Sequence, residues 1–140
     1  MLQYRKETPP IKKYWDLFET TGWNLEYQAT PDELARAIAN SWYLVAVYDE
    51  DRLVGFGRVV SDGVLHAMIY DLIVAPDYQG RGIGTQVLNM LIPQCLEYNI
   101  RDIQLFCARG KRHFYEKFGF VARPEEAPGM HYRRVQAQQV

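Results

Sequence analysis

The glycine-rich run at residues 79–84 constrains this chain more than any other feature of its sequence. The run is Gln79-Gly80-Arg81-Gly82-Ile83-Gly84, and it lies between a nearly continuous apolar stretch and a segment with helical periodicity. Alternating glycines at a strand-to-helix junction let a ligand approach closely, because no Cβ blocks the backbone. The unpaired N–H groups of the first helical turn face the same point, where the helix dipole favours negative charge. The run therefore predicts a diphosphate-binding loop; a tight turn that uses glycine only for its geometry is the alternative.

The spacing of the run disfavours two common phosphate-binding motifs. It does not match G-x-G-x-x-G, and no Gly-Lys-Ser/Thr follows it. The dinucleotide-binding and P-loop interpretations both lose support for that reason. A different kind of anion-binding loop remains.

The residues before the loop predict an antiparallel meander. Strand-like segments span residues 42–48, 52–61 and 64–75, separated by the polar turn 49–51 and by Asp62-Gly63, a strong two-residue turn signal. Residues 2–6 alternate weakly and form a candidate edge strand. Helices are expected over residues 11–20 and over about 31–40, the second opened by a capping-box pattern of Thr30 and Glu33.

The residues after the loop predict a change to parallel pairing. Apolar residues at 83, 87, 88, 91 and 92 indicate a helix that ends near Tyr98, with Pro93 kinking it or marking its last turns. The apolar run 101–107 then predicts a buried strand, reached by a helical crossover and therefore parallel to the strand before the loop. A helix over 111–118 stopped by Gly119, strands over 120–123 and 130–135, and fraying over 136–140 complete the order.

Composition and charge narrow the class of protein. With 140 residues, 48% hydrophobic and 24% charged, the chain is expected to be a single domain over residues 1–140. Its net charge of −1 argues against a general nucleic-acid binder. Residues 1–7 lack the apolar core of a signal peptide, and Asp71 interrupts the most apolar strand, so a cytoplasmic protein with no membrane segment is expected. Cys95 and Cys107 form no CxxC pair, which predicts reduced, buried thiols and no metal site.

Two motifs together resemble the GCN5-related N-acetyltransferase (GNAT) superfamily. Residues 79–84 satisfy the cofactor-loop pattern Gln/Arg-x-x-Gly-x-Gly/Ala of that superfamily, after the strand, Pro and aromatic of Leu72-Ile73-Val74-Ala75-Pro76-Asp77-Tyr78. About thirty residues later, Phe114-Tyr115-Glu116-Lys117-Phe118-Gly119-Phe120 resembles its Phe-Tyr-x-x-x-Gly-Phe segment. The resemblance covers roughly residues 42–135. One departure is that Ala108 and Lys111 stand where family members often carry Asn and Ala, which puts contacts to the pantetheine arm from that helix in doubt.

The resemblance implies a fold and a cofactor. The fold would be α+β, with a mostly antiparallel twisted sheet of six to seven strands, one splayed parallel pair and about four helices. The co-substrate would be acetyl-CoA, with no metal. The pantetheine arm would pair with the splayed strand like an added strand, and the loop would hold the pyrophosphate with support from Arg81. The expected cofactor-binding residues are Leu72, Ile73, Val74, Gln79, Gly80, Arg81, Gly82, Ile83, Gly84, Thr85, Phe114 and Tyr115.

The same resemblance suggests catalytic residues. An amide near Ile73 or Val74 would polarise the thioester carbonyl, and Tyr115 would protonate the leaving thiolate; core packing is the alternative for Tyr115. Asp71 is a candidate base because a buried carboxylate has a raised pKa, although it could equally bind a cationic substrate or satisfy backbone donors. His66 and His113 are weaker candidates for the base.

The acceptor is less constrained than the donor. Trp15, Phe18 and Trp23 fall where the superfamily builds its acceptor wall, with core packing as the default role. A narrower likeness to the serotonin N-acetyltransferase-like branch of plastids, cyanobacteria and small bacterial proteins rests on residues 40–47, 53–55, 70–74 and 127–130. We therefore expect a small-molecule amine acceptor, an arylalkylamine among the candidates. A protein Lys or N-terminal acetyltransferase and a catalytically silent acyl-CoA sensor are the alternatives, and a homodimer is one expected state.

Overall fold

Five strands form one sheet in the computed structural model, which describes residues 1–134. The strands are β1 (Leu2–Arg5), β2 (Tyr43–Asp49), β3 (Arg52–Ser61), β4 (His66–Val74) and β5 (Asp102–Leu105). Their spatial order follows the chain, and every neighbouring pair is antiparallel except β4 and β5, which are parallel. The predicted α+β class, the meander and the switch to parallel pairing are confirmed.

The number of strands differs from the six to seven expected. In the described residues, 120–123 and 130–134 form no strand, and residues 121–134 are exposed. A strand needs a buried face to offset the entropy of ordering it, and these segments bury none. Residue 135 of the predicted last strand and the predicted fraying of 136–140 lie outside the described residues.

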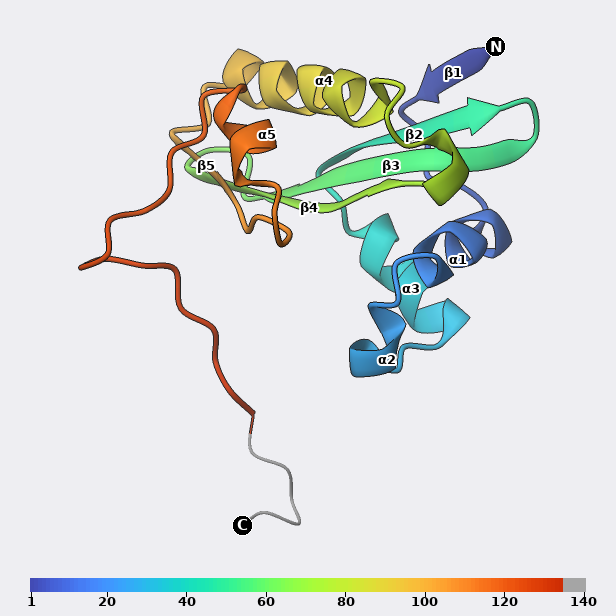
Figure 1. Ribbon diagram of the computed structural model, residues 1–140, viewed down its shortest axis with the longest axis horizontal. Coiled ribbons are helices and arrows are strands. Elements are labelled where there is room, and N and C mark those ends of the chain that lie inside the picture. Colours follow the sequence, from blue (N-terminus) through green and yellow to red (C-terminus); the bar gives the residue numbers. More distant parts are fainter. Residues whose placement is uncertain (135–140) are drawn as a thin grey trace. The chain divides into compact units, whose positions relative to one another are not determined.

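The helices are α1 (Ile11–Glu19), α2 (Asn24–Tyr27), α3 (Pro31–Ala39), α4 (Ile83–Glu97) and α5 (Arg112–Glu116), with a 3₁₀ turn η1 (Pro76–Tyr78). Of these, α1 to α4 lie on both faces of the sheet (Figure 1). Helix α4 covers one face, and α1 to α3 cover the other. The predicted capping box opens α3: the Thr30 side chain accepts from the Glu33 amide at 3.2 Å, and the Glu33 side chain accepts from the Thr30 amide at 2.9 Å. The short helix α2 was not predicted.

The chain forms two compact units, Met1–Phe106 and a second that begins at Cys107. The sheet and helices α1 to α4 belong to the first unit, and α5 belongs to the second. No helix of the described residues is long and apolar enough to cross a membrane.

One layer of the core of the first unit lies between α4 and the sheet, and another lies between the opposite face and helices α1 and α3. Gly57 on β3 lets α4 sit close, because a Cβ there would come within 2.7 Å of the Val87 side chain and 3.1 Å of Leu91. The buried side chains of α4 are Ile83, Val87, Leu88, Leu91 and Cys95. Pro93 lies inside this helix, which ends at Glu97 as expected. This packing fixes where α4 begins, and therefore where the glycine-rich run lies.

Three local predictions were wrong. Asp62-Gly63 is not a two-residue turn: β3 ends at Ser61 and β4 begins at His66, because Asp62 Oδ1 accepts from three successive amides, those of Val64, Leu65 and His66, and so stabilises a longer loop. Cys107 is exposed rather than buried, since β5 stops at Leu105 and leaves it outside the sheet. The strand β5 is itself half-buried rather than buried.

Candidate active site

The edge of β4 that faces β5 is open along its second half. Parallel pairing joins His66–Ile69 of β4 to Asp102–Leu105 of β5, and no described strand pairs with this edge beyond Ile69. On its other edge β4 stays paired with β3 as far as Val74. Residues Leu72 to Val74 therefore lie on the splayed, one-sided part of the strand, as expected. Backbone groups on such an edge need partners.

The direction of one backbone group follows from two hydrogen bonds. The Ala75 amide donates to Val54 O at 2.8 Å, on the β3 side, and Val74 O accepts from Gln79 Nε2 at 3.0 Å. Peptide groups alternate in direction along a strand, so the N–H of Val74 faces the open edge and that of Ile73 faces β3. Of the two amides considered from the sequence, Val74 is therefore the one available to a ligand.

The glycine-rich run forms the junction between η1 and α4. Gly80 and Gly82 have backbone φ angles of +80° and +84°, which residues other than glycine adopt only at a cost in free energy. Gly82 is the N-cap of α4. The Gln86 amide donates to Gly82 O at 3.0 Å, as the first helical bond. The preceding amides of the first turn, those of Ile83, Gly84 and Thr85, lie at the positive end of a 15-residue helix. This junction fits a diphosphate.

Side chains of the β2–β3 hairpin clamp the start of this loop. Both Arg52 terminal nitrogens donate to the Asp77 carboxylate, at 2.7 and 2.9 Å, and hold the pKa of that carboxyl below its usual value. The Tyr78 hydroxyl donates to Asp49, which lowers the pKa of Asp49. Arg81 does not extend freely from the loop: its guanidinium lies 4.8 Å from the centre of the Tyr78 ring. The loop is thus anchored before any ligand binds.

A cavity of about 400 Å³ lies on the face of the sheet that α1 to α3 cover. Its lining comes from α1, α2, α3, β3 and β4 and mixes aromatic, aliphatic and charged side chains. The lining residues are Tyr14, Phe18, Tyr27, Gln28, Ala29, Glu33, Leu34, Ala37, Ile38, Arg58, Tyr70 and Asp71. The volume is within the range of small-molecule sites. Tyr70 and Asp71 belong both to this cavity and to the splayed part of β4.

A β-bulge turns Asp71 toward this cavity. Phe56 pairs with Ile73 and Arg58 with Tyr70, so Gly57 alone faces two residues of β4, Asp71 and Leu72. Asp71 takes a φ of +56°, which breaks the alternation of side chains along the strand. As a result Tyr70 and Asp71, although consecutive, both line the cavity.

Asp71 is ion-paired, which the sequence analysis did not anticipate. Its Oδ2 accepts from Arg58 Nε at 2.7 Å, and Arg58 Nη1 also donates to Ala37 O at 3.1 Å. Asp71 is therefore a half-buried carboxylate with a cationic partner, and its role as a base stays a prediction. Arg58 was missed, although an arginine in the apolar segment 52–61 opposite an aspartate in the next strand was a visible signal.

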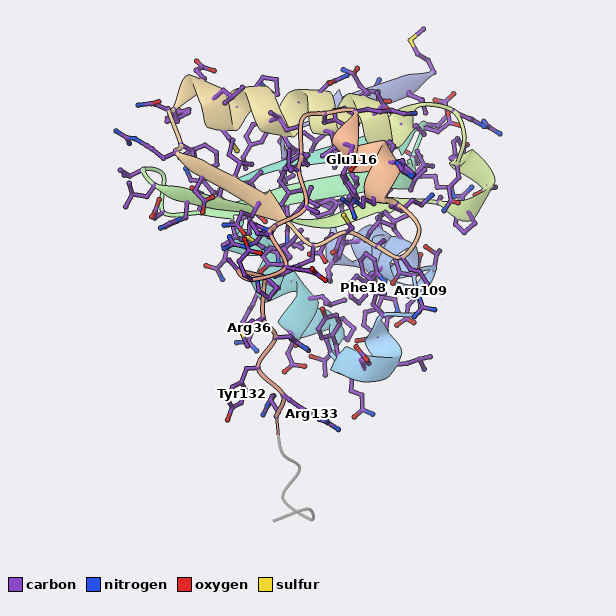
Figure 2. All side chains as sticks on the ribbon, turned by 60° about the vertical axis from the view of Figure 1, so that its left-hand side comes forward. Phe18, Arg36, Arg109, Glu116, Tyr132 and Arg133 are labelled. Atoms are coloured by element: carbon purple, nitrogen blue, oxygen red, sulfur yellow. The ribbon has the colours of Figure 1, made fainter. Side chains whose placement is uncertain are left out.

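The three aromatic residues proposed for the acceptor wall differ in position. Phe18 is buried, lines the cavity, and lies on the face of the sheet away from α4 (Figure 2). Trp23 packs its ring edge-on against Phe18, with 5.9 Å between ring centres, and is not among the lining residues. Trp15 does not line the cavity either. The sequence analysis missed Tyr14, Tyr27 and Tyr70, which do line it.

The two candidate histidines belong to different units, His66 to the first and His113 to the second. His66 Nδ1 is 3.1 Å from Asp102 Oδ2, at the paired start of β4 and β5. His113 is exposed on α5, with Nδ1 3.0 Å from Glu116 Oε1, and Figure 2 labels Glu116 on that helix. Neither lines the cavity.

The second unit carries Tyr115 on α5. The residue is buried, and its ring packs at 5.1 Å from Phe114 and 6.2 Å from Phe120, measured between ring centres. Burial, and then the proximity of Cys107, raise the pKa of the Tyr115 hydroxyl. The hydroxyl therefore keeps its proton at neutral pH. Lys111 is the N-cap of this helix, which ends before Gly119 as predicted.

Comparison with known proteins identifies relatives of the whole core. The model of the acetyltransferase (GNAT) family matches residues 9–120. The chain is 36% identical to an uncharacterized N-acetyltransferase, ycf52, of Pyropia yezoensis, over 67% of this chain and 56% of that protein. It is 34% identical to histone acetyltransferase TAP1 of Glycine max, over 70% of this chain and 47% of that protein. The chain thus spans about half the length of these curated relatives.

A solved structure confirms the fold. A probable acetyltransferase from meticillin-resistant Staphylococcus aureus superimposes with a TM-score of 0.82 at 24% identity, over 96% of this chain and 100% of that one. The family match covers the splayed strand, the glycine-rich loop and the Phe114-Tyr115 segment alike. The chain belongs to the acetyltransferase (GNAT) family.

Proposed function

We propose that this protein transfers an acetyl group from acetyl-CoA to the primary amine of a small molecule with an apolar, aromatic body. The observation that carries the proposal is the shared position of Tyr70 and Asp71. These residues belong to the open half of β4, where a donor would pair, and they also line a cavity of acceptor size. Donor and acceptor would thus meet at one short stretch of backbone.

The residues of the first unit fit acetyl-CoA. The open edge at Leu72 to Val74 offers backbone partners to the pantetheine arm, and the amides that begin α4 offer donors to the diphosphate. Acetyl-CoA would supply the acetyl group as a reactive thioester. The N–H of Val74 would stabilise the charge that develops on the acetyl oxygen. The residues proposed to hold the donor are Leu72, Ile73, Val74, Gln79, Gly80, Arg81, Gly82, Ile83, Gly84 and Thr85, with Phe114 and Tyr115 added from the family motif.

The charge of the cavity favours a cationic acceptor. Two carboxylates, Asp71 and Glu33, face it against one guanidinium, that of Arg58. An alkylamine is mostly protonated at neutral pH, so the excess negative charge would attract it. Because Asp71 is already paired with Arg58, we assign it to binding the ammonium group of the substrate. One proton of that ammonium leaves to water or to the Asp71 carboxylate.

Proton delivery is proposed to come from Tyr115. The neutral amine nitrogen forms a bond to the acetyl carbon, the C–S bond breaks, and the thiolate takes the hydroxyl proton of Tyr115. The proton that the nitrogen loses as it becomes an amide then restores the Tyr115 hydroxyl, directly or through water. The assignment rests on the match to the family's Phe-Tyr segment. The Tyr115 hydroxyl carries its proton at the start of the reaction, as a general acid must.

A protein acceptor is the second candidate. The relative from Glycine max carries the name histone acetyltransferase, so a lysine side chain is an alternative amine. A cavity of about 400 Å³ with aromatic side chains in its lining suits a small ring better than an extended peptide. A catalytically silent acyl-CoA sensor is the third candidate function.

The deciding experiment is release of free thiol from acetyl-CoA with a panel of acceptors. The panel contains 2-phenylethylamine, tryptamine, spermidine, an aminoglycoside and a histone-tail peptide. Release with the two arylalkylamines is expected. Release with the peptide alone would assign the protein acetyltransferase function, and tight binding of CoA with no release for any acceptor would assign the sensor.

A further inference from the structure

The hydroxyl of Tyr14 is a polar group that the description above leaves without a role. Tyr14 lies on α1, is only 1% exposed, and lines the acceptor cavity. No described residue makes a hydrogen bond with this hydroxyl. Every fully buried side-chain N or O atom of the described residues has a hydrogen-bond partner. Because the Tyr14 hydroxyl has none, it must be accessible and account for the small exposed area of this residue. Because Tyr14 lines the cavity, we infer that its hydroxyl faces that space.

The ring of Tyr14 is held rigidly. It packs edge-on against Phe56 with 4.7 Å between ring centres, and against Phe18 with 5.8 Å. Its hydroxyl therefore cannot swing away to find another partner. A hydroxyl that is fixed in a cavity and has no partner within the protein is available to a ligand.

The electrostatics of the site keep this hydroxyl neutral. Burial raises the pKa of Tyr14 well above its usual value, and the nearby Asp71 carboxylate raises it further while Arg58 opposes this. Tyr14 lies close to the Arg58–Asp71 pair, since all three residues line the same cavity. A neutral hydroxyl oxygen beside a carboxylate is a suitable acceptor for the N–H groups of an ammonium.

The cavity has a polar floor and an aromatic rim. Tyr14, Arg58 and Asp71 form the polar part, whereas Tyr27 and Tyr70 are exposed at the opening. The rim is continuous with Phe18, whose ring centre is 6.4 Å from that of Tyr27. An occupant with an ammonium at one end and a flat apolar ring at the other would match both parts.

We propose that Tyr14 is a positioning and specificity-determining residue for the acceptor, and that the acceptor is a primary arylalkylammonium. The Tyr14 hydroxyl oxygen accepts a hydrogen bond from an N–H of the ammonium group, and Asp71 faces the charge of that group. This inference rests on the proposed function for the acetylation of the bound amine. The role given to Tyr14 concerns only the binding of that amine. The hydroxyl takes up one N–H, and so fixes the orientation of the nitrogen. Acceptors that lack an N–H lose this contact and keep the attraction to Asp71.

The first test measures binding without acetyl-CoA. Titration of 2-phenylethylamine followed by NMR is compared with titration of trimethyl(2-phenylethyl)ammonium, which keeps the charge and the ring and has no N–H. Tyr14→Phe should weaken binding of the primary amine about ten-fold or more and leave the quaternary ligand within about two-fold. Tyr48→Phe, a buried tyrosine of β2 outside the cavity, is the matched control and should change neither.

The outcomes separate the two proposals. Equal weakening of both ligands by Tyr14→Phe, or no binding of 2-phenylethylamine by the unmodified protein at millimolar concentration, would overturn the role of Tyr14. If binding behaves as expected and thiol release fails for all amines, the role of Tyr14 stands and the proposed transfer fails. If transfer occurs, Tyr14→Phe should raise the acceptor KM about ten-fold with the KM for acetyl-CoA unchanged. A rise in both KM values would indicate a merely structural role.

Discussion

The two parts of the candidate site in the first unit are held in place by different means. The donor loop follows η1, whose anchoring ion pair is exposed: the side chains of Arg52 and Asp77 are 53% and 60% accessible. The acceptor cavity is built around Arg58 and Asp71, which are 14% and 20% accessible. An exposed pair contributes at most about 1 kcal/mol, whereas breaking a buried pair leaves an uncompensated charge. The loop should therefore depend on backbone geometry, and the cavity on charge.

The largest effect should come from a residue that belongs to neither part. Tyr115→Phe removes the proposed acid and should lower kcat about 100-fold for every acceptor, because general acid catalysis contributes on that scale. The dissociation constant of CoA should stay within about two-fold. Steady-state rates and calorimetric CoA titration measure the two quantities. An unchanged kcat would remove Tyr115 from the acid role.

Asp71→Asn tests the dependence of the cavity on charge. Asn tolerates the positive φ at this position as Asp does, so the substitution removes the charge and keeps the backbone. The acceptor KM should rise about ten-fold, and unfolding free energy should fall by about 2 kcal/mol, a buried-pair value reduced for partial exposure. Denaturant unfolding and initial rates measure these quantities.

Asp77→Asn is the matched control for that substitution. It breaks the exposed pair with Arg52, and should lower the unfolding free energy by less than about 1 kcal/mol with no change in the acceptor KM. Equal losses of stability from the two variants would contradict the contrast between the two parts of the site.

The contrast also explains which parts of the molecule were predictable. The glycine-rich loop is encoded by contiguous residues whose backbone needs are local, so residues 79–84 predicted both its position and the start of α4. The strands of the meander follow in the same way from the strand-forming residues of 42–48 and 52–61 and from the polar turn between them. These patterns describe the neighbourhood of each residue along the chain.

The cavity is assembled from distant residues and left no contiguous pattern. Tyr14, Arg58 and Asp71 meet only after α1 packs on the sheet and a bulge turns Asp71. Asp71 was noticed as a charge in an apolar strand, but its partner was not, because pairing of Arg58 with it depends on the register of β3 and β4. The predictions of strands over 120–123 and 130–135 failed for another reason. In the described part of these segments β propensity is present, but no buried face is available.

Gly82→Ala tests the dependence of the loop on backbone geometry. Gly82 has a φ of +84° and open space around the position of an added Cβ, so the change introduces backbone strain of about 1 kcal/mol and no clash. The KM for acetyl-CoA should rise about five-fold, while the acceptor KM stays unchanged. Gly22→Ala is the control, since Gly22 has a φ of +77° and equally open space after α1. It should cost similar stability and leave both KM values unaltered.

The smallest effect should come from the clamp on the loop. Tyr78→Phe removes the hydroxyl that donates to Asp49 and keeps the ring beneath Arg81, so the KM for acetyl-CoA should rise only about two-fold. The Tyr78 hydroxyl is the main reason that the pKa of Asp49 is lowered, and in the variant this pKa should return toward the ordinary value of an aspartate. A carboxyl with a lowered pKa stabilises the folded state above its unfolded pKa and loses this contribution as pH falls through its folded pKa. The stability difference between the two proteins should therefore be largest at neutral pH and vanish in acid. Thermal unfolding from pH 7 to pH 2 measures it, and a difference that persists at the acid end would show that the clamp acts through ring packing instead.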